Sequence, residues 1–179
     1  RMFSKKLQNI HLGNILLGFA ILMFGMSTMS GSVSSLKENP QFIDMLTKFS
    51  NPIIGIIVGM LFTCVLQSAS ASIGILQSLA VTGAVSFATA LPLTMGIGIG
   101  AALPVLLSSL GATTAGKRTA VVYLVIDVLG AIICGVVFYA ADAAVGFSFM
   151  SSSMTMVSIA LMNTVYRLVR FIVLFPMIG

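Results

Sequence analysis

Apolar runs long enough to cross a bilayer recur along almost the whole of this chain. Only 7% of its residues are charged, against about 25% in soluble domains. Because about 20 apolar residues span the hydrocarbon core as a helix, we predict an all-α integral membrane protein that is embedded in a lipid bilayer. A signal peptide does not account for the pattern, since the runs continue to residue 179.

Four of these runs are predicted to be full transmembrane helices, namely 10–30, 87–110, 120–141 and 154–178. The first of them is followed by the most polar part of the chain, 31–51. In that part, apolar residues recur at helical spacing at Phe42, Ile43, Leu46 and Phe49. This spacing predicts a short amphipathic helix that lies at the membrane interface.

The stretch 52–85 is long for one crossing, and the polar sequence QSASAS at 67–72 interrupts it. It either crosses once or folds into a hairpin that returns to its starting side. Basic residues favour the cytoplasmic side. Only the hairpin puts the basic N-terminus and the predicted basic loop 111–119, which carries Lys117 and Arg118, on that same side. We therefore predict a broken-helix, re-entrant hairpin over about 52–85 and a cytoplasmic N-terminus.

The QSASAS break offers several polar groups to a ligand. Gln67 supplies an amide, and Ser68, Ser70 and Ser72 supply hydroxyls that donate and accept hydrogen bonds. Backbone N–H groups at the start of the next half-helix, which we place near Ser72, are suited to an oxyanion, and nearby oxygens are suited to Na⁺. The structural alternative is that small residues here simply allow close helix packing.

A second unusual stretch, MGIGIGAALP at 95–104, contains Gly96, Gly98 and Gly100, with Pro92 and Pro104 on either side. Glycine in a helix interior costs about 1 kcal/mol relative to alanine, and proline about 3 kcal/mol. The stretch therefore indicates either an unwound turn or the close approach of another backbone.

Three charges fall within the predicted spans: Asp127, Arg167 and Arg170. Such residues are costly in a bilayer and have a partner or a function. Counted from the helix ends, Asp127 and Arg170 lie at similar depths, and Arg167 lies about one turn deeper. We favour a structural ion pair of Asp127 with one arginine over a direct substrate role. Arg170 has the alternative of extending to the interface.

Several other functions find no support in the sequence. Cys64 and Cys134 are expected to be buried thiols, and His11 stands alone, so no transition-metal site is predicted. The net charge of +5 is gathered near span ends, which indicates membrane topology rather than nucleic-acid binding. We find no nucleophile–base pair for an enzyme, no channel filter and no organic cofactor site.

The segment TCVLQSASASIGILQSLAVTGAVS resembles the QSSS segment of the type II sodium-dependent phosphate cotransporters and their bacterial relatives, with Ala69 replacing one serine. The resemblance extends to LLGFAILMFGMSTMSGSV, to NPIIGIIVGMLFT and to the closing ALMNTVYRLVRFIVLFP. The glycine segment is similar to the family's G-x-N-I-G-T, with Gly98 and Ala101 in place of the polar residues. Ile126-Asp127 stands where the family has Phe-Asn.

The resemblance implies two inverted repeats, each with a QSSS hairpin, and binding of phosphate and Na⁺ where the hairpins meet. On this chain it implies a phosphate site and a Na⁺ site. The residues implied for phosphate are Gln67, Ser68 and Ser70, and those implied for Na⁺ are Ser68, Ser70, Ser72, Gly96 and Gly100.

Because a single QSSS-like copy is present, residues 1–179 are expected to form one transmembrane repeat of a longer protein or a half-transporter. A second repeat or a second copy would complete the site. The predicted function is sodium-coupled phosphate symport, with the bacterial plasma membrane as the expected location. The alternative is a non-transporting membrane subunit or assembly module that keeps the fold.

Overall fold

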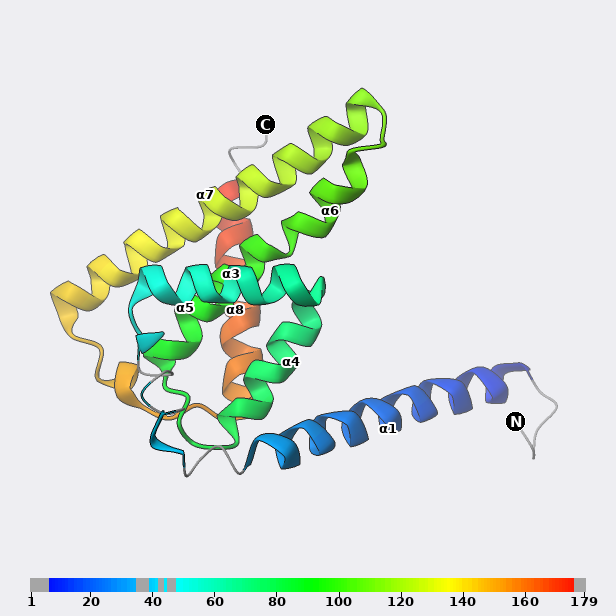
Figure 1. The fold of residues 1–179 in the computed structure, drawn as a ribbon, viewed down its shortest axis with the longest axis horizontal. Coiled ribbons are helices and arrows are strands. Elements are labelled where there is room, and N and C mark those ends of the chain that lie inside the picture. The colour runs from blue at the N-terminus through cyan, green and yellow to red at the C-terminus, as the bar shows by residue number, and fades with distance from the viewer. Residues whose placement is uncertain (1–6, 35–38, 42–43, 45–47, 176–179) are drawn as a thin grey trace.

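The computed structural model describes residues 7–34, 39–41, 44 and 48–175, and within these ranges it is built from helices and contains no β-sheet. The helices are α1 (Leu7–Ser34), α3 (Pro52–Leu66), α4 (Ala69–Ala80), α5 (Phe87–Gly100), α6 (Ala102–Ser109), α7 (Thr114–Val145), the 3₁₀ turn η2 (Ser148–Ser151) and α8 (Met156–Leu174). Figure 1 shows that α1 meets α4 near its C-terminal end and otherwise extends away from the other helices, which pack together.

Four segments are long and apolar enough to cross a membrane: Leu7–Met29, Phe87–Ser109, Thr114–Val145 and Met156–Leu174. The prediction of an all-α membrane protein with four spans is therefore confirmed. Between α1 and α3, residues 40, 41, 44 and 48 are helical. Phe42, Ile43 and Leu46 of the predicted interfacial helix lie outside the described residues.

The predicted hairpin region contains two helices with a sharp break between them. Asn51 begins α3 by accepting hydrogen bonds from the N–H groups of Ile53 and Ile54, at 3.1 and 3.4 Å. The helix ends at Gln67, whose φ of 54° and ψ of 22° place it in the left-handed region. Ser68 then starts α4 as its N-cap. The second helix thus begins at Ala69, earlier than the start near Ser72 that we predicted, because Ser68 supplies the cap.

Helices α3 and α5 pack closely through glycines, and their contacts show that they run in the same direction. A Cβ added to Gly55 would meet Pro92 at 2.7 Å, and one added to Gly100 would meet the Met60 carbonyl oxygen at 2.7 Å. A Cβ on Gly96 would collide with the backbone of Ile56. The residue numbers rise together along both helices. Small residues spaced by four therefore allow the two backbones to approach, as in other membrane helices.

The span that starts at Phe87 is interrupted at Ala101, where α5 gives way to α6. Pro104 explains the interruption, because it has no N–H to donate to the carbonyl of Gly100, four residues earlier. Of the two interpretations of the glycine stretch, the structure supports the close approach of another backbone: Gly96 and Gly100 are helical and packed on α3, and Ala101 after them keeps a right-handed helical conformation, with φ of −63° and ψ of −21°.

Helix α7 starts at Thr114, because Thr113 accepts a hydrogen bond from the N–H of Gly116 at 3.4 Å. Lys117 and Arg118 therefore lie in the first turns of α7, and the connection from α6 is shorter than the predicted loop 111–119. At its other end, α7 stops at Gly146, which has a φ of 67°.

Backbone hydrogen bonds connect the link between α7 and α8 to the start of α5. The N–H of Phe87 donates to the Ser152 carbonyl at 3.1 Å, and that of Met154 donates to the Val85 carbonyl at 2.8 Å. Around it, Phe87 packs against the rings of Phe138 and Phe149, with centroids 5.8 and 4.9 Å away. The ends of α4 and α7 and the starts of α5 and α8 are consequently held at one end of the bundle.

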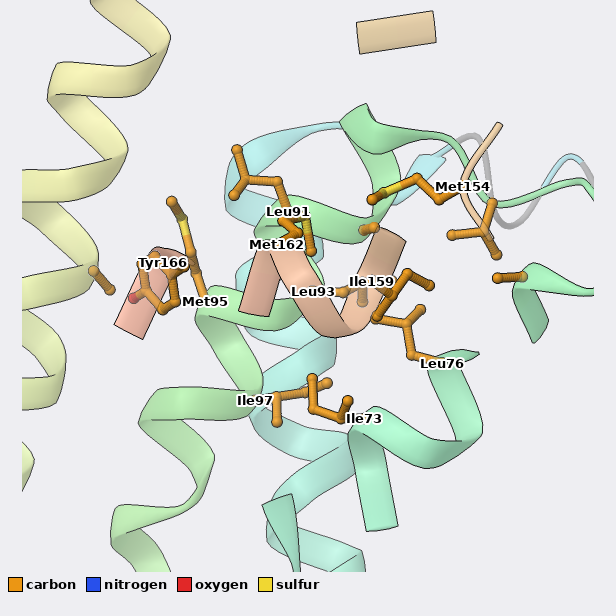
Figure 2. Close-up of a cluster of buried hydrophobic side chains, with 14 residues drawn as sticks. Ile73, Leu76, Leu91, Leu93, Met95, Ile97, Met154, Ile159, Met162 and Tyr166 are labelled. Atoms are coloured by element: carbon orange, nitrogen blue, oxygen red, sulfur yellow. The ribbon is translucent and has the colours of Figure 1, made fainter. Parts of the chain in front are cut away.

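The core lies where α4, α5 and α8 meet. Figure 2 shows Ile73 and Leu76 of α4 beside Leu93 and Ile97 of α5, with Ile159 of α8 close by. These side chains are at most 8% exposed. The core thereby fixes α4, and with it the QSASAS break, against the helices that follow.

Candidate functional site

The QSASAS segment forms the tip at which α3 ends and α4 begins. Ser68 Oγ accepts a hydrogen bond from the N–H of Ala71 at 3.3 Å and lies 3.3 Å from Ser70 Oγ. Gln67 and Ser70 are exposed, and Ser68 is half-buried. The first N–H groups of a helix have no partner within the helix. The tip therefore presents hydroxyls, an amide and the positive end of α4 to the surroundings.

Ser72 does not share this exposure. It is fully buried, and its hydroxyl donates to the Ser68 carbonyl at 3.0 Å while accepting from Thr63 Oγ1 at 3.0 Å. Thr63 belongs to α3 and Ser72 to α4, so this pair ties the two arms together directly behind the tip.

The glycines of α5 lie next to α3. A Cβ on Gly100 would be 2.8 Å from the Cβ of Thr63, so the end of α5 lies behind the tip as well. Gly96 lies one turn earlier against Ile56. Gly98 points another way, toward α8, and its Cβ would be 3.7 Å from Nη1 of Arg170.

Of the two arginines on α8, Arg170 is the one whose guanidinium contacts the carboxylate of Asp127 on α7. The Asp127 side chain is 1% exposed and that of Arg170 is 14% exposed. Gly130 makes the contact possible, because a Cβ there would collide with the aliphatic stem of Arg170. The guanidinium also lies 6.0 Å from the centre of the Tyr166 ring. The pair joins α7 and α8 where they cross.

Arg167 is placed differently. It is exposed, and its Nε donates to Asn163 Oδ1 at 3.1 Å on the same helix. Asp127 therefore contacts Arg170, whereas the hydrogen bond that the structure describes for Arg167 is the one to Asn163.

Metal ligation of the transition-metal type finds no support in the described part of the chain, which holds no group of three His, Cys, Asp or Glu side chains. A cavity of about 720 Å³ opens between α5, α7 and α8, and it is lined almost wholly by apolar side chains. The polar groups of the QSASAS tip lie outside this cavity.

Two residues that support the site were missed from the sequence. Thr63 donates a hydrogen bond to Ser72 behind the tip, and Gly130 leaves space for the aliphatic part of the Arg170 side chain. A signal existed for Thr63, since Gly55, Gly59 and Thr63 are small residues at a spacing of four and define the face of α3 that packs on α5. No comparable pattern singled out Gly130.

Comparison with known proteins gives one family and one relative. A sequence model of the Na⁺/Pi-cotransporter family matches residues 21–163. The uncharacterized protein YqeW of Bacillus subtilis (strain 168) is 28% identical over 122 residues, which cover 66% of this chain and 39% of that protein. The matched region therefore spans well under half the length of this relative. No solved structure gives a significant match.

Proposed function

Because this chain belongs to the Na⁺/Pi-cotransporter family, we propose that it forms one half of a sodium-coupled phosphate symporter whose ligands bind at the tip between α3 and α4. Family membership supports phosphate transport as the function. The observation that carries the finer proposal is the left-handed break at Gln67, which exposes the N-terminus of a capped helix within an apolar region.

In this proposal, phosphate is held by the side chains of Gln67, Ser68 and Ser70 together with the first N–H groups of α4. Helix N-termini favour anions because their N–H groups point outward and the dipole is positive there. Serine hydroxyls and the glutamine amide add donors that can follow the orientation of a tetrahedral oxyanion.

Sodium is proposed to bind close by, at oxygens of Ser68, Ser70 and Ser72 and at the backbone of Gly96 and Gly100. Gly100 is supported by its place in the fold. Its carbonyl lacks the usual helical partner, because Pro104 has no N–H, and Gly100 packs against Thr63 behind the tip. Hard cations such as Na⁺ prefer such oxygen ligands.

The hairpin is proposed to enter and leave the membrane on one side. Helix α3 runs parallel to α5, and α4 turns back toward the end at which α5 begins. With α3 and α4 re-entrant, the N-terminal end of α1 and the start of α7, with Lys117 and Arg118, lie on the same side. Positive residues favour the cytoplasm, so that side is proposed to be cytoplasmic.

The other half of the site is proposed to come from a second repeat or a second copy of the chain. The tip is exposed, and YqeW is much longer than its matched region. Ion-coupled transporters built from inverted repeats bind their ligands between the repeats near the middle of the membrane. Rocking of one half against the other would then expose the site to each side in turn.

Uptake of labelled phosphate into proteoliposomes tests the proposal, with the full-length protein and a Na⁺ gradient. We expect uptake to require Na⁺ and to fall at least about tenfold in Gln67→Ala and Ser68→Ala, the loss expected for a hydrogen bond to a charged ligand. Ser148→Ala, at an exposed serine of η2, is the matched control and should retain uptake. No Na⁺-dependent uptake by intact wild-type protein would refute symport and favour a non-transporting membrane subunit.

A further inference from the structure

Arg167 is a charged residue in a membrane-spanning helix that the ion pair does not use. It lies seven residues before Leu174, which is about 10 Å along the helix. The three described aspartates are engaged elsewhere: Asp127 contacts Arg170, Asp44 pairs with Lys48, and Asp142 accepts from the N–H of Phe147. An arginine at such a depth is costly when it faces lipid and typically marks the path of a substrate or an ion.

The Arg167 side chain does not extend to the nearer end of the span. Its Nε bonds to Asn163, one turn closer to the start of α8. This bond turns the guanidinium toward the middle of the helix and away from Leu174. Arginines that escape the bilayer extend in the opposite sense, toward the interface. The geometry therefore argues for a partner inside the membrane.

The QSASAS tip lies at about the same level as Arg167. Gln77 of α4 donates to the Met156 carbonyl at the start of α8, at 3.0 Å. From that contact, α4 leads back nine residues to Ser68, about 14 Å, and α8 leads forward eleven residues to Arg167, about 16 Å. Figure 1 shows the two helices diverging from the end where they meet.

Arg167 also lies on the side of α8 that is turned toward α4. Ile159, Asn163 and Arg167 follow one another at intervals of four residues, which places them along one side of the helix. Ile159 packs with Ile73 and Leu76 of α4 in the buried core (Figure 2), and Asn163 is half-buried one turn further along α8. Beyond the point at which the two helices diverge, the Arg167 side chain is exposed.

We propose that Arg167, oriented by Asn163, supplies the positive charge that binds the oxyanion at the tip; this assignment rests on the function proposed above. A guanidinium presents N–H groups in a fork that matches two oxygens of a phosphate. Serines, an amide and a helix dipole carry only partial charges. Arg167 accordingly adds the full charge that the tip itself lacks.

Phosphate uptake by Arg167 variants of the full-length protein tests the assignment. We expect Arg167→Gln to raise the KM for phosphate by about ten- to a hundredfold, the loss expected for a hydrogen bond to a charged group. Arg167→Lys, which keeps the charge without the fork, should show a smaller increase. Thr164→Val is the matched control, because Thr164 is exposed on α8 and bonds to its own helix at the Ala160 carbonyl; its KM should not change.

An unchanged KM in Arg167→Gln would overturn the role of Arg167 and leave the proposed symport standing, whereas a wild type without Na⁺-dependent uptake would overturn both. If the glutamine variant fails to insert, Arg167→Cys with Cys64 and Cys134 replaced carries the test. Attachment of a cationic aminoethylthio group should then lower the KM relative to a neutral methylthio group. Equal KM values after the two treatments would contradict the assignment.

Discussion

The Thr63 hydroxyl on α3 donates a 3.0 Å hydrogen bond to the Ser72 hydroxyl on α4, and both side chains are fully buried. The bond crosses the hairpin directly behind Gln67. Because Ser72 in turn donates to the Ser68 carbonyl, the residue that caps α4 is linked to the opposite arm. The exposed tip is therefore supported by buried hydroxyls that are hydrogen-bonded to each other and to the Ser68 carbonyl.

Removing the Thr63 hydroxyl is expected to loosen the hairpin. Thr63→Val keeps the shape of the side chain and leaves Ser72 without its donor, so the free energy of unfolding in detergent should fall by about 1 kcal/mol. Thr164→Val, whose hydroxyl bonds only within α8, should change it much less. Equal losses in the two variants would show that the bond across the hairpin has no particular importance.

The glycines that join α3 and α5 should tolerate no side chain. In Gly96→Ala the new Cβ would collide with the Ile56 backbone, so the helices must separate and about 2 kcal/mol or more of stability should be lost. Gly74→Ala on α4 is the control, since nothing lies within 4 Å of its Cβ position. That change should stabilise the protein by about 0.5–1 kcal/mol. Thermal unfolding in detergent ranks the two, and a stable Gly96→Ala would contradict the packing.

The buried pair of Asp127 and Arg170 should be sensitive to loss of one partner and tolerant of the loss of both. Asp127→Leu or Arg170→Met alone leaves a buried charge, which costs about 3–5 kcal/mol. The double variant removes both charges and should recover most of that loss. Unfolding measurements on the four proteins form a double-mutant cycle. Additive losses in the double variant would show that the two residues do not act as a pair.

The left-handed backbone of Gln67 allows its conformation to be separated from its side chain. Gln67→Gly removes the amide but adopts a positive φ without strain, so it should preserve the stability of the hairpin while reducing phosphate uptake. Gln67→Val, with a branched side chain, should lower stability as well. Full uptake by the folded glycine variant would exclude the Gln67 amide from phosphate binding.

Much of the fold follows from local rules that the sequence displays. The long apolar runs predict the spans, and the polar residues of QSASAS predict the break between α3 and α4. The depth of Asp127 within its run pointed to a partner on the last helix. These inferences succeed because length, polarity and buried charge constrain a membrane chain strongly.

The remaining features depend on rotation and contact between helices. The positions of the two arginines within their apolar run did not determine which of them contacts Asp127. Arg170 makes the contact because Gly130, which has no Cβ, leaves room for its aliphatic stem. Likewise, the sequence left open whether the glycine stretch unwinds or packs on another backbone, and only the structure identifies α3 as the helix that Gly96 and Gly100 contact. The start of α4 was placed near Ser72, because serines are good caps and several lie in a row.

Chemical modification of Ser70→Cys tests most directly whether phosphate and Na⁺ meet at the hairpin tip. In a full-length protein with Cys64 and Cys134 replaced, a hydrophilic maleimide should label residue 70, since Ser70 is exposed. Ser148→Cys, at an exposed position in η2, serves as the control. We predict that phosphate slows labelling of residue 70 only when Na⁺ is present and does not affect residue 148. An unchanged rate at residue 70 under every combination of Na⁺ and phosphate would contradict a site at the tip.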